Sequence, residues 1–308
     1  MQTRRQFARS AASLAALAAL SPLLPGSVWA APADGLITRT IPGTDEALPI
    51  IGLGTASSFN VSLDDKEAMS PLRDVLRTLV NGGGRLIDTA PSYGRAEAVT
   101  GALVGDGGLR KRTFLATKVS SQGKQRGAAQ IEASFKALRA ETIDLIQVHN
   151  LQDTANQLAL LRELKQEGRV RYIGITHYVD SAHEDLIEAM ERDKVDFVQF
   201  NYSVGARNAE KRLLPYCVDN GIATLINRPF LRGDLFNKVR EKPLPDWASE
   251  IDVTTWAQMM LKFVVAAPGV TVAIPATSNP RYMADNLMAG QGRMPDDKQR
   301  ERIAQLFA

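Results

Sequence analysis

The stretch Leu86-Ile87-Asp88-Thr89-Ala90-Pro91-Ser92-Tyr93-Gly94 places a carboxylate and a phenol directly after two apolar residues. Leu86-Ile87 is typical of the end of a buried strand, and the residues after it are typical of a loop. One interpretation is a turn in which Asp88 caps the next helix and Tyr93 packs sideways. The other is a strand end that presents both groups for chemistry. The strand ends farther along the chain favour the second interpretation.

Short apolar runs of strand length alternate with amphipathic stretches of helix length on both sides of this segment. The apolar runs seldom alternate with polar residues, which is typical of a parallel sheet covered by helices. The expected strands are 50–55, 85–89, 113–119, 143–149, 170–177, 196–202, 223–227 and 270–275. The expected helices are 71–81, 96–104, 128–140, 157–167, 182–192, 210–220, 255–267, 280–288 and 297–307.

Repeated strand–helix units favour a single α/β domain, a closed (β/α)8 barrel of the TIM type over residues 36–308. A turn at 42–45 between two short apolar runs predicts an N-terminal hairpin before the barrel. Residues 241–253 are expected to form a long loop. The main alternative is an open doubly wound sheet. The glycine-rich segments 81–84 and 105–108 argue weakly against it, because neither connects a strand to a following helix as a phosphate-binding loop does.

The N-terminus has the pattern of an export signal. Arg4-Arg5 precedes an apolar run at 11–20, and Val28-Trp29-Ala30 places small residues at a cleavage site. This pattern predicts a twin-arginine signal peptide over residues 1–30, cleaved after Ala30, with the twin-arginine export machinery as partner and the periplasm as location. The alternative is an N-terminus that stays uncleaved. The apolar run is too short for a stable membrane span, and none is expected in the mature chain.

Charge, cysteine and histidine content exclude several kinds of site. The formal net charge of +3 equals the contribution of the three arginines in the predicted leader, so it gives no indication of nucleic-acid binding. Cys217 is the only cysteine, which excludes an internal disulfide and a thiolate metal site. His149, His177 and His183 lack the spacing of a metal motif, so no metal is expected. His183 is expected to begin a helix and to face solvent.

The working residues of a barrel of this kind lie at the carboxyl ends of its strands. Those ends carry Asp88 on the second expected strand, Lys118 on the third and His149 on the fourth, and Tyr93 lies on the loop after the second. Taken singly, Lys118 could be a solvated strand end and His149 a hydrogen-bonded core histidine. Together, the four side chains are expected to be neighbours on one rim of the barrel.

The chain resembles the aldo-keto reductase family from about residue 50 to residue 286. The resemblance rests on Leu86-Ile87-Asp88-Thr89-Ala90 with Tyr93-Gly94, on Ala116-Thr117-Lys118, and on Ile143-Asp144-Leu145-Ile146-Gln147-Val148-His149. These segments are similar to the three signature segments of that family, in the same order. The resemblance implies an NAD(P)H-dependent oxidoreductase that reduces a small-molecule aldehyde or ketone to an alcohol by hydride transfer.

For the four rim residues, the resemblance implies that Tyr93 is the proton donor, Lys118 and Asp88 are its electrostatic partners, and His149 orients the carbonyl. Hydride arriving at a carbonyl carbon leaves an alkoxide, which must be protonated as it forms. A free phenol, with a pKa of ~10, is a poor donor at neutral pH, and a buried ammonium beside it favours the phenolate. Asp88 allows Lys118 to stay charged away from water. His149 can donate a hydrogen bond to the carbonyl oxygen.

The same resemblance implies a bound nicotinamide cofactor, NADP(H), with NAD(H) as the alternative. It matches Gln199 to the nicotinamide carboxamide, residues 229–233 to the pyrophosphate loop, and residues 274–286 to a clamp around the adenosine phosphate. Within the clamp, Thr277 and Arg281 are available to a 2′-phosphate. The full set of implied cofactor contacts is Thr55, Asp88, His177, Gln199, Arg228, Phe230, Arg232, Thr277, Arg281, Asp285 and Asn286.

Three positions depart from the family pattern. His177 stands where asparagine is usual, Asn227 where an aromatic ring commonly stacks on the nicotinamide, and Ala276 where a basic residue is common. A second hypothesis is therefore a nicotinamide-binding sensor or accessory protein without significant turnover. The tail after Asn286 is short, which predicts an open substrate pocket.

Overall fold

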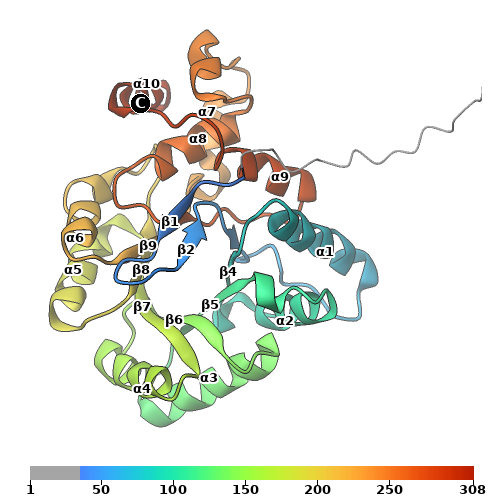
Figure 1. The fold of residues 1–308 in the computed structure, drawn as a ribbon, viewed down its shortest axis with the longest axis vertical. Helices are drawn as coiled ribbons and strands as arrows, with labels where there is room; N and C mark the ends of the chain where they lie inside the picture. Colours follow the sequence, from blue (N-terminus) through green and yellow to red (C-terminus); the bar gives the residue numbers. More distant parts are fainter. Residues whose placement is uncertain (1–34) are drawn as a thin grey trace, which may run out of the picture. The chain divides into compact units, whose positions relative to one another are not determined.

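The described part of the protein is residues 35–308 of a computed structural model. The predicted signal peptide, residues 1–30, lies outside the described residues. Within the described part, helices form a ring around a central set of strands (Figure 1).

Eight parallel strands pair in chain order, each with the next, as the sequence predicts for a (β/α)8 fold. The first and last strands meet through the bridges Ile51–Ala273 and Gly54–Ala276, so the sheet is a nearly closed barrel and the open-sheet alternative is wrong. The strands are β3 (Leu53–Gly54), β4 (Leu86–Asp88), β5 (Phe114–Val119), β6 (Ile143–His149), β7 (Val170–Thr176), β8 (Phe197–Asn201), β9 (Ala223–Asn227) and β10 (Val272–Ala273).

Glycine allows the seam between β3 and β10 to close. A Cβ atom on Gly54 would lie 2.8 Å from the carbonyl oxygen of Ile274, which is closer than a side chain tolerates. The Gly54 amide instead approaches the seam and donates to the oxygen of Pro275 at 3.1 Å. A larger residue here would push the first strand away from the last.

The helices follow the strands as the periodicity predicts, with shifted ends. They are α1 (Lys66–Asn81), α2 (Ala96–Asp106), α3 (Lys124–Leu138), α4 (Thr154–Gln166), α5 (His183–Arg192), α6 (Leu213–Asp219), α7 (Asp234–Val239), α8 (Trp256–Val265), α9 (Pro280–Met288) and α10 (Asp297–Phe307). Helix α9 and helix α10 have the predicted bounds.

Two predictions of local structure were wrong. The helix expected from Pro71 begins at Lys66, because the Asp65 side chain caps it by accepting from the Ala68 amide at 2.9 Å, and Pro71 lies inside it. The expected loop at 241–253 contains a 3-10 helix at Asp246–Ile251, and it is preceded by α7, which was not predicted.

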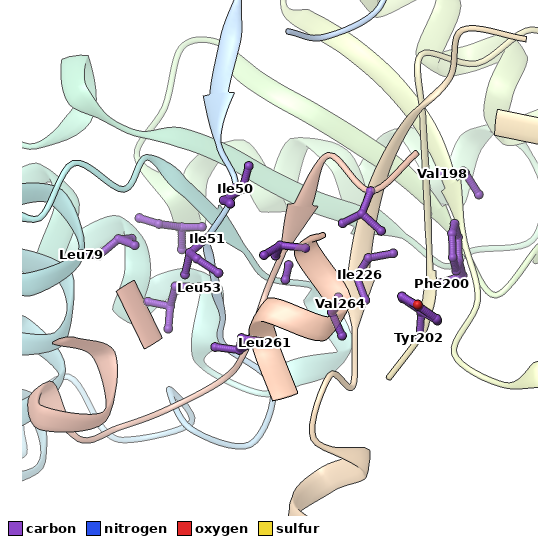
Figure 2. Close-up of a cluster of buried hydrophobic side chains, with 14 of the residues drawn as sticks. Ile50, Ile51, Leu53, Leu79, Val198, Phe200, Tyr202, Ile226, Leu261 and Val264 are labelled. Carbon is purple, nitrogen blue, oxygen red and sulfur yellow. The ribbon is translucent and has the colours of Figure 1, made fainter. Parts of the chain in front are cut away.

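The core has an outer layer between strands and helices and an inner layer inside the barrel. Figure 2 shows part of the outer layer, where Leu53 and Ile226 lie close to Leu261 and Val264 of α8. Successive side chains on a strand point to opposite faces, so one strand supplies both layers. On β5, Leu115 and Val119 belong to the outer layer, and Phe114 belongs to the inner one.

The N-terminal hairpin predicted from the sequence is confirmed and adds to the inner layer. Strand β1 (Thr38–Thr40) pairs antiparallel with β2 (Ala47–Pro49). Ile41 and Leu48 from this hairpin join an apolar cluster with Phe114, Tyr172 and Phe197, whose ring centroids lie 5.5–6.0 Å apart. The amino end of the barrel is therefore filled with apolar side chains.

Candidate active site

The inner faces of strands β4 to β9 change from apolar to polar toward their carboxyl ends. On β5 the inward row is Phe114, Ala116 and Lys118, and on β4 it ends at Asp88. The strand register brings these two ends together, because Asp88 pairs with Ala116, and Lys118 follows Ala116 by two residues on the same inward face of β5. The two charged side chains therefore converge at the rim opposite the hairpin, as residues that are two apart on a strand share one face.

Asp88 and Lys118 form a buried ion pair. The Lys118 Nζ donates to Asp88 Oδ2 at 2.6 Å and to the backbone oxygen of Thr89 at 2.9 Å. Lys118 is 1% exposed and Asp88 is 2% exposed. Removing either partner would leave an uncompensated charge in the interior.

Two glutamines donate further hydrogen bonds to the Asp88 carboxylate. Gln199 Nε2 donates to Asp88 Oδ1 at 2.8 Å, and Gln147 Nε2 donates to the same oxygen at 3.3 Å. The sequence analysis gave no role to Gln147. Its position two residues before His149, on the inward face of β6, is the signal that could have identified it.

Tyr93 lies on the loop after β4, at the end of a 3-10 turn over Pro91–Tyr93. The Lys118 Nζ lies 5.1 Å from the centroid of its ring. Burial by itself lowers the pKa of Lys118, but the charges of Asp88 and Tyr93 outweigh it, so that the pKa is raised above its usual value. Lys118 is accordingly a permanent cation next to the phenol.

His149, at the end of β6, also lies next to Tyr93. The two ring centroids are 6.1 Å apart and the rings meet edge to face, at 84°. Burial, with smaller contributions from Lys118 and His177, lowers the pKa of His149 to about 4. The imidazole is therefore neutral at neutral pH and carries one N–H. Its Nδ1 lies 3.5 Å from Ser92 Oγ, which leaves Nε2 for a ligand.

Of the residues implied in cofactor binding, Thr55, Gln199 and His177 lie on the same rim. Thr55 donates from both its amide and its hydroxyl to the backbone oxygen of Asp88, at 3.0 Å each. Asn227 Nδ2 donates to the backbone oxygen of His177 at 3.0 Å and to Gln199 Oε1 at 3.4 Å. Both the nitrogen and the oxygen of the Gln199 side-chain amide are therefore hydrogen-bonded within the protein.

Two polar atoms on this side of the rim are buried without a partner among the described residues. They are His177 Nδ1 and Asn227 Oδ1. A buried polar atom that lacks a hydrogen bond is destabilising, and in a native protein it usually has a partner that is not part of the chain. These two atoms therefore mark where a polar ligand group fits.

The loop after β9 has an unusual backbone. Arg228, Leu231 and Arg232 have φ values of +52°, +48° and +60°, although none of them is glycine. Conformations of this kind cost about 1–3 kcal/mol each and gather at ligand sites. In this loop the Phe230 ring contacts that of Phe236, with centroids 5.1 Å apart, and Arg232 is exposed.

The residues implied in adenosine binding lie on α9 and just before it. Thr277 Oγ1 accepts from the amide of Asn279, whose side chain in turn caps the helix at Arg281. Asp285 accepts from Thr255 Oγ1 at 2.9 Å and from Gln258 Nε2 at 2.7 Å. Its carboxylate thus holds α9 against the start of α8. Asn286 is buried beside it and Arg281 is exposed.

His183 does not face solvent, so that prediction was wrong. It begins α5 as expected, but it is 2% exposed, with Nε2 3.1 Å from Asn201 Oδ1 and Nδ1 3.2 Å from Asn208 Nδ2. Its burial was not evident from the sequence because its partners come from another strand and loop. Within residues 35–308, no cluster of three or more candidate metal ligands forms, and no helix combines the length and apolar character needed to cross a bilayer.

Comparison with known proteins gives consistent matches. The model of the "Aldo/keto reductase family" matches residues 50–306. The aldo-keto reductase YhdN of Bacillus subtilis is 30% identical over 217 residues, which cover 62% of this chain and 61% of that protein. The NADH-specific methylglyoxal reductase of Escherichia coli is 28% identical over 254 residues, covering 72% and 76% of the two chains.

Solved structures agree with the fold. The crystal structure of an aldo-keto reductase from Klebsiella pneumoniae in complex with NADPH superposes with a TM-score of 0.71, at 24% sequence identity, and covers 89% of this chain and 95% of that one. A thermostable aldo-keto reductase, Tm1743, in complex with the inhibitor epalrestat gives a TM-score of 0.72 at 23% identity, covering 88% and 100%.

Proposed function

The chain belongs to the aldo/keto reductase family, and on that premise we propose that it is an NAD(P)H-dependent oxidoreductase that reduces a small aldehyde or ketone to an alcohol. The observation that carries this proposal is the buried Asp88–Lys118 pair beside the Tyr93 ring. Relatives named as methylglyoxal and glyoxal reductases support a small carbonyl substrate.

Tyr93 serves as the general acid. A bound reduced nicotinamide would supply the hydride for the carbonyl carbon, and the Tyr93 hydroxyl donates the proton to the carbonyl oxygen. Lys118 stabilises the phenolate that is left, because its buried ammonium is held charged by Asp88. The phenolate then recovers a proton from solvent. A positioned acid of this kind contributes roughly 10²–10⁴-fold to the rate.

His149 orients the substrate as a neutral hydrogen-bond donor. Its lowered pKa keeps it uncharged, so it polarises the carbonyl without competing with Tyr93 to transfer the proton. The two rings meet edge to face with centroids 6.1 Å apart, and the substrate oxygen would accept from the hydroxyl of one and the N–H of the other.

The residues on the β7–β9 side fit a nicotinamide dinucleotide. The unpartnered His177 Nδ1 and Asn227 Oδ1 suit the amide group, and the basic loop at Arg228 and Arg232 suits the phosphates. Arg281, which is exposed at the start of α9, is available to a 2′-phosphate, which favours NADP(H), whereas the Thr277 hydroxyl is hydrogen-bonded to Asn279. NAD(H) is the alternative, because relatives include both an NADH-specific enzyme and a structure with NADPH.

The activity is tested by titrating the purified protein with NADPH and NADH, following tryptophan fluorescence, and then adding methylglyoxal and a panel of aldehydes. The expected result is binding followed by oxidation of the bound cofactor in a single turnover. Tyr93→Phe should bind the cofactor normally and lose turnover. Tight cofactor binding with no oxidation by any carbonyl would instead support a sensor or accessory protein.

We also propose that residues 1–30 are a twin-arginine signal peptide and that residues 36–308 form the mature barrel in the periplasm. The support is Arg4-Arg5 ahead of the apolar run and the small residues that end at Ala30. Export in a folded state suits a protein that acquires its cofactor before transport. The test is fractionation of cells that produce wild type or an Arg4→Lys, Arg5→Lys variant, with mass spectrometry of the mature N-terminus. Equal cytoplasmic retention of both would disprove it.

A further inference from the structure

Asn60, on the loop between β3 and α1, contacts the segment that carries Tyr93. The Asn60 Oδ1 atom accepts a hydrogen bond from the Arg95 amide at 3.0 Å, across 35 residues of sequence. On the same loop, Thr55 donates to the backbone oxygen of Asp88 from both its amide and its hydroxyl, at 3.0 Å each. The loop therefore contacts the Tyr93 segment, residues 88–95, at both of its ends.

Helix α2, which follows the Tyr93 segment, begins without a cap from its own sequence. Arg95 is the residue directly before the helix, and its side chain makes no capping hydrogen bond. The first amides of a helix have no acceptor within the helix, so they need one from elsewhere. Asn60 supplies an acceptor to the Arg95 amide, two residues after Tyr93. This bond ties the start of α2 to the loop between β3 and α1.

The residue between Tyr93 and Arg95 is a glycine that lies directly against the Asn60 side chain. Gly94 has a φ of +66°, and a Cβ atom there would lie 2.6 Å from Asn60 Cγ and 2.8 Å from Asn60 Nδ2. Only a residue without a side chain permits this approach and this backbone conformation together. The contact with Gly94 and the hydrogen bond to Arg95 restrict the backbone immediately after Tyr93.

The Asn60 side chain is exposed, but its place on the loop is fixed. The neighbouring Phe59 side chain is fully buried, and the Phe59 amide donates to the oxygen of Thr55 at 3.2 Å. Because the backbone next to Asn60 is already ordered, its hydrogen bond to Arg95 costs little additional conformational entropy. The bond can therefore hold the Tyr93 segment even though it is close to solvent.

Tyr93 depends on such a contact more than the other three rim residues do. Asp88, Lys118 and His149 lie on strands of the barrel, whereas Tyr93 lies on a short 3-10 turn after β4. Pairing between strands fixes the first three but not the phenol. A general acid must lie within hydrogen-bond distance of the oxygen that it protonates, and a displacement of about 1 Å can cost up to ~100-fold in rate.

We propose that Asn60 is a positioning residue, which holds the Tyr93 hydroxyl in place for proton transfer by fixing the backbone of Gly94 and Arg95. The inference rests on the proposed function. Asn60 acts on the reaction through Tyr93, so its effect should appear in the rate of the chemical step rather than in binding of the substrate or the cofactor.

The test compares wild type, Asn60→Ala and Asn60→Asp in the reduction of methylglyoxal. Asn60→Ala removes the acceptor and should lower the single-turnover rate roughly 3- to 10-fold, the range expected for one hydrogen bond, with KM and the cofactor Kd little changed. Asn60→Asp keeps an oxygen acceptor at the same place and should recover most of the rate. A raised KM with an unchanged rate would show contact with the substrate and overturn the proposal, as would a failure of Asn60→Asp to recover the rate.

The matched control is Asp65→Ala on the same loop. The Asp65 side chain accepts from the Ala68 amide at 2.9 Å, so this variant also loses one exposed bond between a side chain and the backbone. It should lower Tm and leave the rate unchanged. The solvent deuterium isotope effect on the single-turnover rate should rise in Asn60→Ala, because the proton donor is misplaced, and stay at the wild-type value in Asp65→Ala. Equal rates and isotope effects in the two variants would show a merely structural role and overturn the proposal.

Amide hydrogen exchange separates this proposal from the proposed function. The Arg95 amide should exchange slowly in wild type and in Asn60→Asp, and several-fold faster in Asn60→Ala, whether or not any carbonyl is reduced. Equal exchange in the three proteins would refute the role of Asn60. Absence of all carbonyl reduction by wild type, with the Arg95 amide protected, would refute the proposed function instead.

Discussion

The two ends of the barrel are built from the same strands and differ in the polarity of the side chains that fill them. At the amino end, Arg171 on β7 contacts both Glu46 of the hairpin and Asp144 of β6, and Tyr172 donates to Glu46 at 2.9 Å. Arg110 adds a second cation to Asp144 at 3.0 Å. Beneath this network the inner layer is apolar.

At the carboxyl end, the same inward rows finish in Asp88, Lys118 and His149, and several groups lack partners within the described residues. His177 Nδ1 and Asn227 Oδ1 are buried without hydrogen bonds, and Arg228 has no carboxylate. At the amino end Glu46 and Asp144 are paired with arginines, although the Nε atom of Arg39 in the hairpin is buried without a hydrogen bond. The carboxyl end keeps buried polar groups whose hydrogen bonds a ligand would complete. It also contains the strained backbone that is typical of ligand sites. Substitutions at the two ends should therefore have different effects.

The largest effect is expected for Tyr93→Phe at the carboxyl end. The change removes the proposed proton donor and keeps the ring, so kcat should fall roughly 10²–10⁴-fold with little change in stability. The measurement is steady-state reduction of an aldehyde beside urea unfolding. A fall in kcat of less than tenfold would show that another group protonates the product.

Lys118→Met should affect both activity and stability, because it leaves the Asp88 carboxylate buried without its ion-pair partner. We expect a loss of about 3–5 kcal/mol in the free energy of unfolding. The double variant Asp88→Asn, Lys118→Met is the control: it should recover part of the stability and none of the activity. Full activity in either variant would contradict the role given to the pair.

The pH dependence of stability should report on His149. Its pKa is lowered from 6.5 to about 4 on folding, first by burial and then by Lys118 and His177. Between these pH values the unfolded chain binds the extra proton and the folded chain does not, so stability is lost as pH falls through this range. Wild type should lose about 2 kcal/mol more than His149→Gln between pH 7.5 and pH 4.5, measured by urea unfolding. Parallel curves would show that the histidine is not held neutral.

The smallest effect is expected at the amino end. Arg171→Met removes a side chain that is 40% exposed, so solvent screening limits the loss to about 1–2 kcal/mol, even though Asp144 is only 5% exposed. Activity should not change, because the residue lies at the opposite end of the barrel. A Tm decrease with unchanged kcat/KM would support the division between the two ends, and a loss of activity would contradict it.

The order of strands and the rim residues could be predicted because they depend on local patterns. The apolar runs identify each strand, and a polar residue at the end of such a run marks the carboxyl rim, as at Asp88 and Lys118. The helix boundary at Asp65 and the helix α7 were less predictable. Pro71 resembles a helix start, and a capping aspartate six residues earlier competes with it.

The amino-acid sequence by itself determined the eight strand–helix units and the chemical types that meet at one rim, because the periodicity of side chains fixes which face each residue occupies. Only the tertiary structure decided which of these groups become partners. The Asp88 carboxylate is shared by Gln147 and Gln199, His183 is buried against Asn201, and Arg228 is left without an anion. Hydrogen bonds and ion pairs between distant strands depend on closure of the barrel, and no local pattern encodes that geometry.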